Sequence, residues 1–231
     1  MQKIPLNRAL SKLGVLSRAQ ATDAILAGRV RVDGRRVRKP TTMIVPGQAR
    51  IELDGARAHK APWRAILFHK PRGVVTTRSD PEGRKTIYDV LGDAARGLIA
   101  VGRLDAATSG LLILTSDTQL GDWLTDPVNE VPRLYVVTVR GRVDPDVLLS
   151  LTARITLRKV SNRESHLLVE LHEGKNRQVR RMFGAIGHEV TSLKRVRFGG
   201  LELGTLAPGQ FREILHTDIS KAFPGAPVRE V

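Results

Sequence analysis

Asp105 is the residue whose sequence setting could make it a catalytic carboxylate. It stands in a short loop between two apolar runs, at 98–103 and 111–115, that we expect to form buried strands. Burial and a neighbouring cation can together set the protonation state of such a carboxylate. An aspartate in this position can also cap its own turn by hydrogen bonding to Thr108 or Ser109, as in an Asx turn. The local sequence leaves both roles open.

A second group of residues that could take part in chemistry is a set of arginines in the segment 173–188. Arg177, Arg180 and Arg181 lie on the first turns of a predicted helix, where the helix dipole disfavours cations unless an anion compensates. A phosphate group or a carboxylate such as Asp105 would compensate, whereas a solvated face is the ordinary alternative. The apolar face of this helix follows the i, i+3, i+4, i+7 spacing and consists of Val179, Met182, Phe183 and Ile186.

The positive charge is concentrated near the N-terminus. The 231 residues carry a formal net charge of +15, and residues 1–60 contain 13 Lys/Arg against 4 Asp/Glu, a net +9. This excess favours nucleic acid as a partner, with an anionic membrane as the second candidate and a merely basic protein as the plain alternative. The side chains that we expect to bind RNA gather around a predicted hairpin with an Asp-Gly turn and on the helix before it: Arg18, Arg31, Arg35, Arg36, Arg38 and Lys39.

Composition excludes several classes of protein and site. The chain has no cysteine, which rules out disulfides, cysteine-ligated zinc and thiol catalysis. His166 and His172, the closest pair of histidines, have no metal-binding spacing. No run approaches the roughly 20 apolar residues of a membrane span, and residues 1–5 lack the apolar core of a secretory signal. We therefore expect a cytoplasmic protein that binds neither metal nor membrane.

The N-terminal region reads as a small module of two helices and a hairpin. Three leucines within residues 6–13 mark one face of a short helix. Ser17, with Gln20 as its capping-box partner, opens a second helix that Gly28 ends. The hairpin, one further strand and a linker are expected at residues 30–37, 49–53 and 56–63.

The rest of the chain, from residue 63, predicts a larger α+β domain dominated by strands. Connections such as 162–164 are too short for parallel crossovers, so the sheet should be largely antiparallel. Lys70 lies in a basic turn, His-Lys-Pro-Arg-Gly, which by itself indicates no particular chemistry. From His216 onward the sequence shows no hydrophobic periodicity typical of a helix or strand, and we expect a loose tail. The predicted strands lie at 64–69, 98–103, 111–115, 134–140, 155–160, 165–172 and 189–196, and the predicted helices at 87–91, 118–125, 144–151 and 176–186.

Residues 3–55 resemble the S4 RNA-binding domain. The shared features are the Ser-Arg opening of the second helix, a Gly-x-Val-x-Val-x-Gly pattern and the basic hairpin. That domain occurs in many proteins, so this resemblance implies contact with RNA and no particular chemistry. We divide the chain accordingly into an S4-like domain at 1–58 and a catalytic domain at 63–231.

Two further segments make the chain resemble the ribosomal-RNA branch of pseudouridine synthases. They read Gly-Arg-Leu-Asp-Ala-Ala-Thr-Ser-Gly-Leu-Leu at 102–112 and Glu-Gly-Lys-Asn-Arg-Gln-Val-Arg-Arg-Met-Phe-Gly-Ala-Ile-Gly at 173–187. The resemblance extends from about residue 4 to 214. It departs at Asp117-Thr118, where the family usually has Asp-Gly, and at His69, where it often has Asn.

The resemblance implies an α+β fold in which the S4 domain is followed by a largely antiparallel, mixed-sheet catalytic domain. It implies that Asp105 is the catalytic aspartate, that Tyr135 stacks on the target base and that Arg180 pairs with the aspartate. The residues that we expect to bind the substrate nucleotide are Arg103, Leu193, Lys70, Lys175 and Arg177.

Members of this branch isomerise uridine to pseudouridine in ribosomal RNA, and the chemistry requires no cofactor and no metal. The C1′–N1 bond must break and uracil must rejoin the ribose through C5. Attack at C6, attack at C1′ and a glycal route all remain open from the sequence. Each route needs an enclosed pocket, because the detached base must not escape, and base flipping costs a few kcal/mol that aromatic stacking offsets.

The implied partner is ribosomal RNA or a pre-ribosomal particle, and we expect a monomer. The Asp-Pro-Glu-Gly-Arg run at 80–84 favours 23S over 16S RNA. The main alternative is a non-catalytic rRNA-binding or ribosome-assembly factor, which would need neither Asp105 nor Tyr135. A methyltransferase with an S4 domain would need a Gly-rich cofactor loop after a strand, and the sequence contains none.

Overall fold

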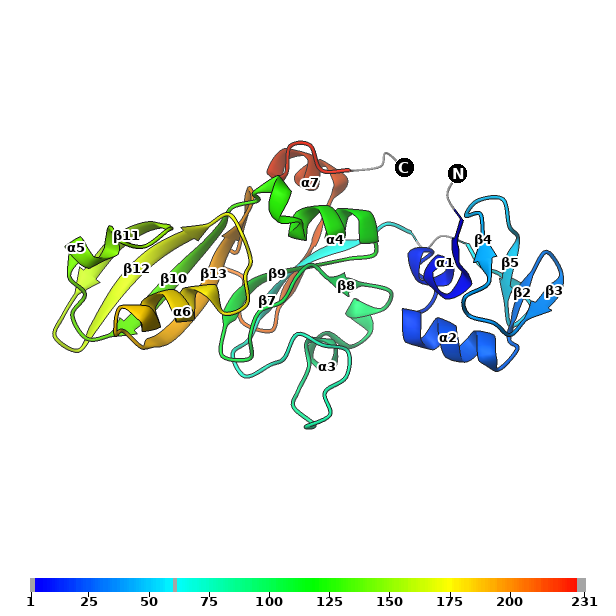
Figure 1. Cartoon of the computed structure of the whole chain (residues 1–231), viewed down its shortest axis with the longest axis horizontal. Helices are drawn as coiled ribbons and strands as arrows, with labels where there is room; N and C mark the ends of the chain where they lie inside the picture. Colours follow the sequence, from blue (N-terminus) through cyan, green and yellow to red (C-terminus); the bar gives the residue numbers. More distant parts are fainter. Residues whose placement is uncertain (1–2, 60–61, 228–231) are drawn as a thin grey trace. The chain divides into compact units, whose positions relative to one another are not determined.

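The structure, a computed structural model, describes residues 3–59 and 62–227 (Figure 1). The chain divides into two compact units. The first runs to Arg64 and takes in two short later segments, Gly97–Ile99 and Ser116–Thr118, and the second comprises the remainder. Each unit has a sheet of its own.

The first unit contains two helices and short antiparallel strands. Strand β1 pairs with β4, and the other strands form a sheet in the order β3-β2-β5-β6. The elements are, in chain order, β1 (Ile4–Pro5), α1 (Leu6–Lys12), α2 (Arg18–Leu26), β2 (Val30–Val32), β3 (Arg35–Val37), β4 (Met43–Ile44), β5 (Ile51–Leu53) and β6 (Ala56–Arg57).

Apolar side chains of the two helices and of β2 form the core of this unit. Leu6, Ile25 and Val30 are fully buried in it. Ser17 begins α2: its hydroxyl accepts a hydrogen bond from the backbone N–H of Gln20 (3.2 Å), and its own N–H donates to the Gln20 side chain (2.9 Å). The predicted helices, hairpin and capping box are therefore confirmed.

The predicted linker at 56–63 is wrong in its first residues. Ala56–Arg57 form β6, in which Ala56 pairs with Leu53 of β5. Asp54 and Gly55 both have positive φ (52° and 82°), and this tight turn returns the chain beside β5 although the sequence after it has no strand pattern. Residues 60 and 61 of the predicted linker lie outside the described residues.

The second unit is built on a nine-stranded sheet in the order β11-β12-β10-β13-β9-β7-β15, with β14 beside β13 and β8 beside β9. The β9–β13 pair is parallel and the other long pairs are antiparallel, which confirms a largely antiparallel α+β domain. The strands are β7 (Ala65–Lys70), β8 (Ile99–Ala100), β9 (Ser109–Thr115), β10 (Arg133–Arg140), β11 (Arg154–Val160), β12 (Glu164–Leu171), β13 (Val190–Phe198), β14 (Leu201–Glu202) and β15 (Phe211–Ile214).

The helices of this unit are short, and α6 packs beside β13 (Figure 1). Helices α3 and α4 have the predicted bounds, α5 is shorter than predicted, and α6 begins two residues later than predicted. Among the helices of the described residues, none combines the length and apolar character needed to cross a membrane. The helices and 3-10 turns are α3 (Ile87–Leu91), η1 (Gly92–Ala95), α4 (Thr118–Thr125), η2 (Pro127–Asn129), α5 (Pro145–Leu148), α6 (Gln178–Ala185) and α7 (His216–Ala222).

The expectation of a loose tail from His216 onward is wrong, because α7 forms there and packs on the sheet. Ile219 and Phe223 are buried, and the Phe223 ring meets Phe198 edge-on at a centroid distance of 5.7 Å. A Cβ at Gly199 would overlap the Phe223 ring. Two apolar side chains four residues apart are enough to pack a short helix against the sheet. They are too few to give a helical periodicity that can be recognised in the sequence.

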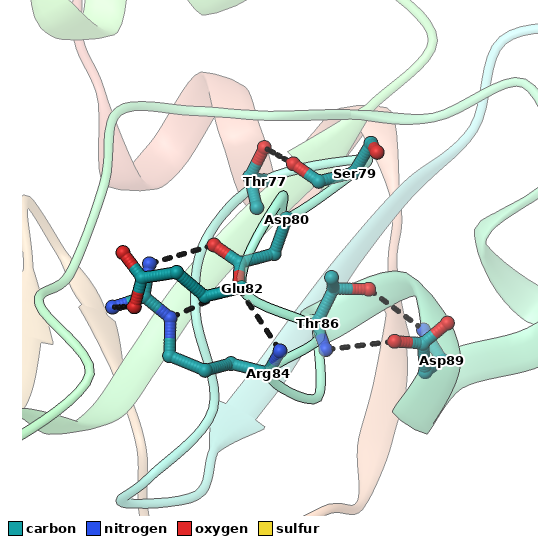
Figure 2. A network of polar contacts seen from close by, with 7 residues as sticks. All are labelled: Thr77, Ser79, Asp80, Glu82, Arg84, Thr86 and Asp89. Carbon is teal, nitrogen blue, oxygen red and sulfur yellow. Dashed lines mark hydrogen bonds and ion pairs between the residues drawn. The ribbon is translucent and has the colours of Figure 1, made fainter.

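The loop between β7 and α3 is ordered by its own polar side chains (Figure 2). Arg84 donates to the Asp80 carboxylate through Nε (3.0 Å) and Nη2 (2.7 Å), and its Nη1 lies 3.0 Å from Glu82. The hydrogen bond from Arg84 holds the pKa of Asp80 below its ordinary value. Thr86 and Asp89 form a reciprocal capping box that begins α3. The polar contacts of Arg84 and of the capping box therefore fix the conformation of the loop.

Candidate active site

The turn that carries Asp105 is held against β13 by a parallel strand pair. Strand β9 begins four residues after Asp105, and its Ser109 and Gly110 pair with Lys194 and Arg195 of β13. Gly110 has a positive φ (110°), and a Cβ there would overlap the backbone of Arg195. Glycine therefore allows β9 to come close enough to place the Asp105 turn beside β13.

Two hydrogen-bonding groups from the segment after β7 hold the backbone on either side of Asp105. The Thr76 hydroxyl donates to the carbonyl of Leu104 (2.8 Å) and accepts from its N–H (3.2 Å). The N–H of Gly73 donates to the carbonyl of Ala106 (2.7 Å). Because Leu104 and Ala106 flank Asp105, the backbone of the turn is fixed on both sides of the carboxylate.

Lys70 supplies a third contact to the same turn from a fully buried position. Its Nζ donates to the carbonyls of Thr108 (2.8 Å) and Pro71 (3.0 Å). Burial lowers the pKa of Lys70 to about 8, and the nearby Asp105 opposes this shift. Lys70, expected to bind the substrate, lies behind the Asp105 turn and contacts its backbone.

The Asp105 side chain is 35% exposed and faces Arg177, whose Nη1 lies 3.7 Å from Oδ2. The turn is closed by the backbone, since the N–H of Thr108 donates to the carbonyl of Asp105 (3.0 Å). Within the described residues, the carboxylate makes no hydrogen bond to Thr108 or Ser109. Its oxygens are therefore not used to cap the turn and remain available to a substrate.

Arg180, expected to pair with Asp105, is held mainly by backbone carbonyls. Its guanidinium donates to Val190 (2.8 Å) and Ala107 (3.2 Å). Burial and the neighbouring Arg177 lower its pKa, and Asp105 opposes the shift. Within the described residues, Arg180 forms no direct ion pair with Asp105, which instead pairs with Arg177. The direct partner is Arg177 because α6 begins two residues later than predicted, which leaves Arg177 at the N-cap in a left-handed conformation (φ 49°).

A cavity of about 490 Å³ opens beside Asp105. Tyr135 of β10, 8% exposed, and Leu193 of β13, 7% exposed, line it together with Asp105. Within the described residues, histidine, aspartate and glutamate side chains form no group suited to hold a metal ion. The cavity is lined by six of the predicted site residues, namely Asp105, Tyr135, Arg103, Leu193, Lys175 and Arg177, whereas Lys70 and Arg180 do not line it.

Three residues of this site have no counterpart in the sequence prediction. Arg133 and Arg195 line the cavity and are buried, and Thr76 holds the Asp105 turn. Arg133 could have been found from strand alternation, since it lies two residues before Tyr135 and shares its face. Arg195 gave no comparable signal, because the register of β10 against β13 shifts between Leu134 and Tyr135.

The predicted RNA-binding residues all lie in the first unit. Arg31 of β2 pairs with Arg36 of β3 on one side and with Glu52 of β5 on the other. Strands β2 and β3, residues 30–37, form the basic hairpin. The side chains that we expect to bind RNA are all exposed: Arg18, Arg31, Arg35, Arg36, Arg38 and Lys39.

Two family models match the chain. The model described as RNA pseudouridylate synthase matches residues 64–185, and the model of the S4 domain matches residues 4–49. The two matches correspond to the sheet domain with the Asp105 cavity and to the module with the basic hairpin.

Relatives of similar length share about a third of the sequence. An RNA pseudouridine synthase of Aquifex aeolicus is 34% identical over 244 residues, which cover 100% of this chain and 98% of the relative. Ribosomal large subunit pseudouridine synthase B of Bacillus subtilis is 35% identical, with 94% of each chain covered. A crystal structure of a pseudouridylate synthase superimposes with a TM-score of 0.64 at 26% identity, covering 95% of this chain and 99% of the other.

Proposed function

The chain belongs to the RNA pseudouridylate synthases and carries an N-terminal S4 domain, and on that premise we propose that it converts uridine to pseudouridine in ribosomal RNA with Asp105 as nucleophile. One observation carries the residue assignment. The Asp105 carboxylate lies on the wall of a cavity that also contains Tyr135, and its nearest cation is Arg177 at 3.7 Å.

We assign the substrate to the large ribosomal subunit. The support is the similarity to the Bacillus subtilis enzyme, whose name specifies that subunit, and the Asp-Pro-Glu-Gly-Arg run at 80–84. We further propose that the enzyme works as a monomer in the cytoplasm, on ribosomal RNA or on a pre-ribosomal particle.

The reaction divides between the two faces of the cavity. On one side Asp105 attacks C6 or C1′, or assists a glycal route, and Arg177 lies beside it. On the other side Tyr135 stacks on the flipped uracil, which offsets part of the cost of removing the base from its helix. Leu193 packs beside the base and Arg103 holds its nucleotide, while Arg180 keeps the Asp105 turn in place through Ala107.

The isomerisation conserves atoms and electrons. The C1′–N1 bond breaks with its electron pair going to uracil, the base turns, and C5 forms the new bond to C1′. C5 then loses its proton, and N1 carries one in the product. A covered cavity keeps the detached base beside the ribose through these steps.

Phosphate groups of the RNA are proposed to bind in two places. Lys175 and Arg177 are exposed at the cavity, where the backbone of the flipped nucleotide must pass. The basic hairpin supplies the second place in the first unit.

Tritium release from RNA labelled at C5 of uridine tests the assignment, because the C5 proton leaves when the new bond forms. Asp105→Asn should abolish release from large-subunit RNA while gel shifts show unchanged RNA binding. Asp93→Asn is the matched control, since Asp93 is 91% exposed and pairs with Arg96. Release by the Asp105 variant at the wild-type rate contradicts the assignment, and RNA binding by the wild type without any release supports the non-catalytic alternative.

A further inference from the structure

Two buried arginines lie close to one phenylalanine ring in the Asp105 cavity. The guanidinium carbons of Arg133 and Arg195 each lie 4.9 Å from the centre of the Phe198 ring. Arg133 is 5% exposed and Arg195 3% exposed, and all three residues line the cavity. Two positive charges are therefore held close together away from water, which is costly without a compensating anion.

The structure itself supplies no such anion. Within the described part of the chain, neither guanidinium lies within ion-pairing distance of a carboxylate. Burial lowers the pKa of Arg133, and the charge of Arg195 lowers it further. The pair thus has positive charge in excess at the place where the substrate base must enter.

The two arginines differ in how many donors remain available. Arg133 donates to three backbone carbonyls, those of Val131 (2.9 Å), His172 (3.1 Å) and Leu124 (3.1 Å). Arg195 donates through Nε to the carbonyl of Leu111 (2.8 Å), while its buried Nη2 has no partner among the described residues. Of the two arginines, Arg195 is therefore the one with a buried guanidinium nitrogen that has no hydrogen-bond partner among the described residues.

The strand register puts Arg195 next to the residue that is proposed to stack on the base. Arg195 of β13 pairs directly with Tyr135 of β10, and side chains of directly opposed residues are neighbours on one face of a sheet. A base that lies flat on Tyr135 presents its edge to the neighbouring strand. The edge of uracil carries the O2 and O4 carbonyl oxygens, which are hydrogen-bond acceptors.

We propose that Arg195 donates to a carbonyl oxygen of the target uracil and stabilises the negative charge that the base acquires during the reaction. The proposal rests on the isomerisation described under the proposed function. Cleavage of C1′–N1 leaves its electron pair on uracil, spread over N1, O2 and O4, and attack at C6 also moves charge onto O4. A fixed cation at the base edge therefore acts in every one of the open routes, and Arg133 raises the local potential without touching the base.

The depth of Arg195 argues for the base over a phosphate group. Exposed cations of the same cavity, Lys175 and Arg177, are available for phosphates that remain partly hydrated. A phosphate group at Arg195 would have to leave water completely and take its ribose neighbours with it. A flat, neutral base enters such a place at lower cost and becomes charged only in the transition state.

Single-turnover rates with Arg195→Gln test the proposal. With enzyme in excess over total RNA from cells lacking this gene, labelled with 5-tritiated uridine, the variant should release tritium about 10²-fold more slowly than the wild type, the usual effect of removing one such donor. The affinity for RNA and the slope of its logarithm against log salt should not change. Arg197→Gln is the matched control: Arg197 lies on the same strand and pairs with Glu170 (2.6 Å), and its rate should stay at the wild-type value.

A leaving-group comparison separates this role from a structural one. Fluorine at C5 withdraws electrons and makes uracil a better leaving anion, so transcripts made with 5-fluorouridine should depend less on Arg195. The rate at which the N1-linked nucleoside disappears is measured by chromatography of digested RNA. On the fluorinated transcript, Arg195→Gln should slow this loss by less than about 10-fold. An equal deficit on the 5-fluorouridine transcript and on the RNA labelled with 5-tritiated uridine, an unchanged rate, or weaker binding with a reduced salt slope overturns the proposal.

Three further results keep the test decisive. If melting shows that Arg195→Gln does not fold, Arg195→Lys replaces it, and its smaller deficit should show the same dependence on fluorine. If the wild type releases tritium from RNA other than the large-subunit fraction, the substrate assignment fails while the Arg195 comparison stands. If the wild type is active and Arg195→Gln is equally active, the proposal for Arg195 alone fails.

Discussion

The basic hairpin and the Asp105 cavity are both rich in arginine, but they hold their charges in opposite ways. Arg31 and Arg36 of the hairpin are exposed and face each other across two strands. Arg133 and Arg195 of the cavity are buried on Phe198, and backbone carbonyls fix them in place. The first arrangement leaves the cations hydrated, and the second removes their water before a substrate arrives.

This difference in hydration separates binding from chemistry. Hydrated cations attract phosphate groups over a distance, and salt screens that attraction. Desolvated, fixed cations act on charge that develops in a transition state and are screened much less. Substitutions in the cavity should therefore change the rate of the chemical step, and substitutions in the hairpin should change the affinity and its salt dependence.

Gly110→Ala should have the largest effect on the cavity side. The Cβ of the alanine overlaps the backbone of Arg195, and the residue must also adopt the positive φ of Gly110. Strands β9 and β13 should therefore separate. We expect a loss of about 3 kcal/mol in the free energy of unfolding and at least about 10²-fold in tritium release. Gly184→Ala is the control, because α6 has open space there and alanine favours the helix. Equal activity of both variants would contradict the close strand approach.

Lys70→Met should have the next largest effect, through the Asp105 turn. It leaves the buried carbonyls of Thr108 and Pro71 without their donor, which should cost about 2 kcal/mol in the free energy of unfolding and lower the rate of tritium release. Urea unfolding and single-turnover assays at pH 7 measure both. A variant with normal stability and normal rate would show that the turn does not depend on Lys70.

The pH dependence of stability gives Lys70 a second test. The folded protein releases the Lys70 proton near pH 8, while the unfolded chain keeps it up to the ordinary pKa of 10.5. The unfolded state therefore binds more protons between these values, and the contribution of Lys70 to stability rises with pH across that window. The free energy of unfolding of the wild type relative to Lys70→Met should increase from about pH 7.5 to about pH 9.5. A constant difference would contradict the buried position of the amine.

Arg177→Gln should have an intermediate effect and decides which arginine acts on Asp105. The Arg177 side chain is 54% exposed, so we expect little change in stability and about a 10-fold slower release of tritium. Arg180→Gln should instead destabilise the fold by about 2 kcal/mol, because two carbonyls lose their donor. Arg181→Gln, exposed on the same helix, is the control. Slower tritium release by Arg180→Gln with little loss of stability, together with a normal rate for Arg177→Gln, would show that Arg180 is the direct partner of Asp105.

Substituting the basic hairpin should have the smallest effect on chemistry. Arg31→Gln combined with Arg36→Gln should weaken RNA binding about 10-fold and reduce the salt slope by about 1 for each phosphate group that is no longer neutralised. The single-turnover rate at saturating enzyme should not change. Arg96→Gln, an exposed arginine paired with Asp93, is the control and should leave the salt slope unchanged. A slower rate at saturation would erase the distinction between the two regions.

The order of elements could be predicted from the sequence because it depends on local patterns, whereas most of the cavity residues are implied by the resemblance to a known family. The capping box at Ser17 and the alternation of β10 are visible in a few residues each. The segment 102–112 contains both Asp105 and Gly110, so one motif carries the carboxylate and the glycine that positions it.

Features that depend on the packing of distant residues could not be predicted in this way. Arg195 resembles a solvated strand residue until the shifted register places it beside Tyr135. Arg177, and not Arg180 as expected, pairs with Asp105 in a structure whose helix α6 begins two residues later than predicted. Helix ends are the part of a helix that a sequence pattern predicts least well. Helix α7 depends on Phe223 meeting Phe198, a pairing without local signal.

The most direct test of the central claim is a map of pseudouridine in ribosomal RNA from cells that lack this gene and carry one of three replacements. The wild type and Asp93→Asn should restore a pseudouridine in large-subunit RNA that the gene-deleted cells lack, whereas Asp105→Asn should leave that position as uridine. Restoration by Asp105→Asn, or maps that are identical with and without the gene, would contradict the claim that this chain modifies ribosomal RNA through Asp105.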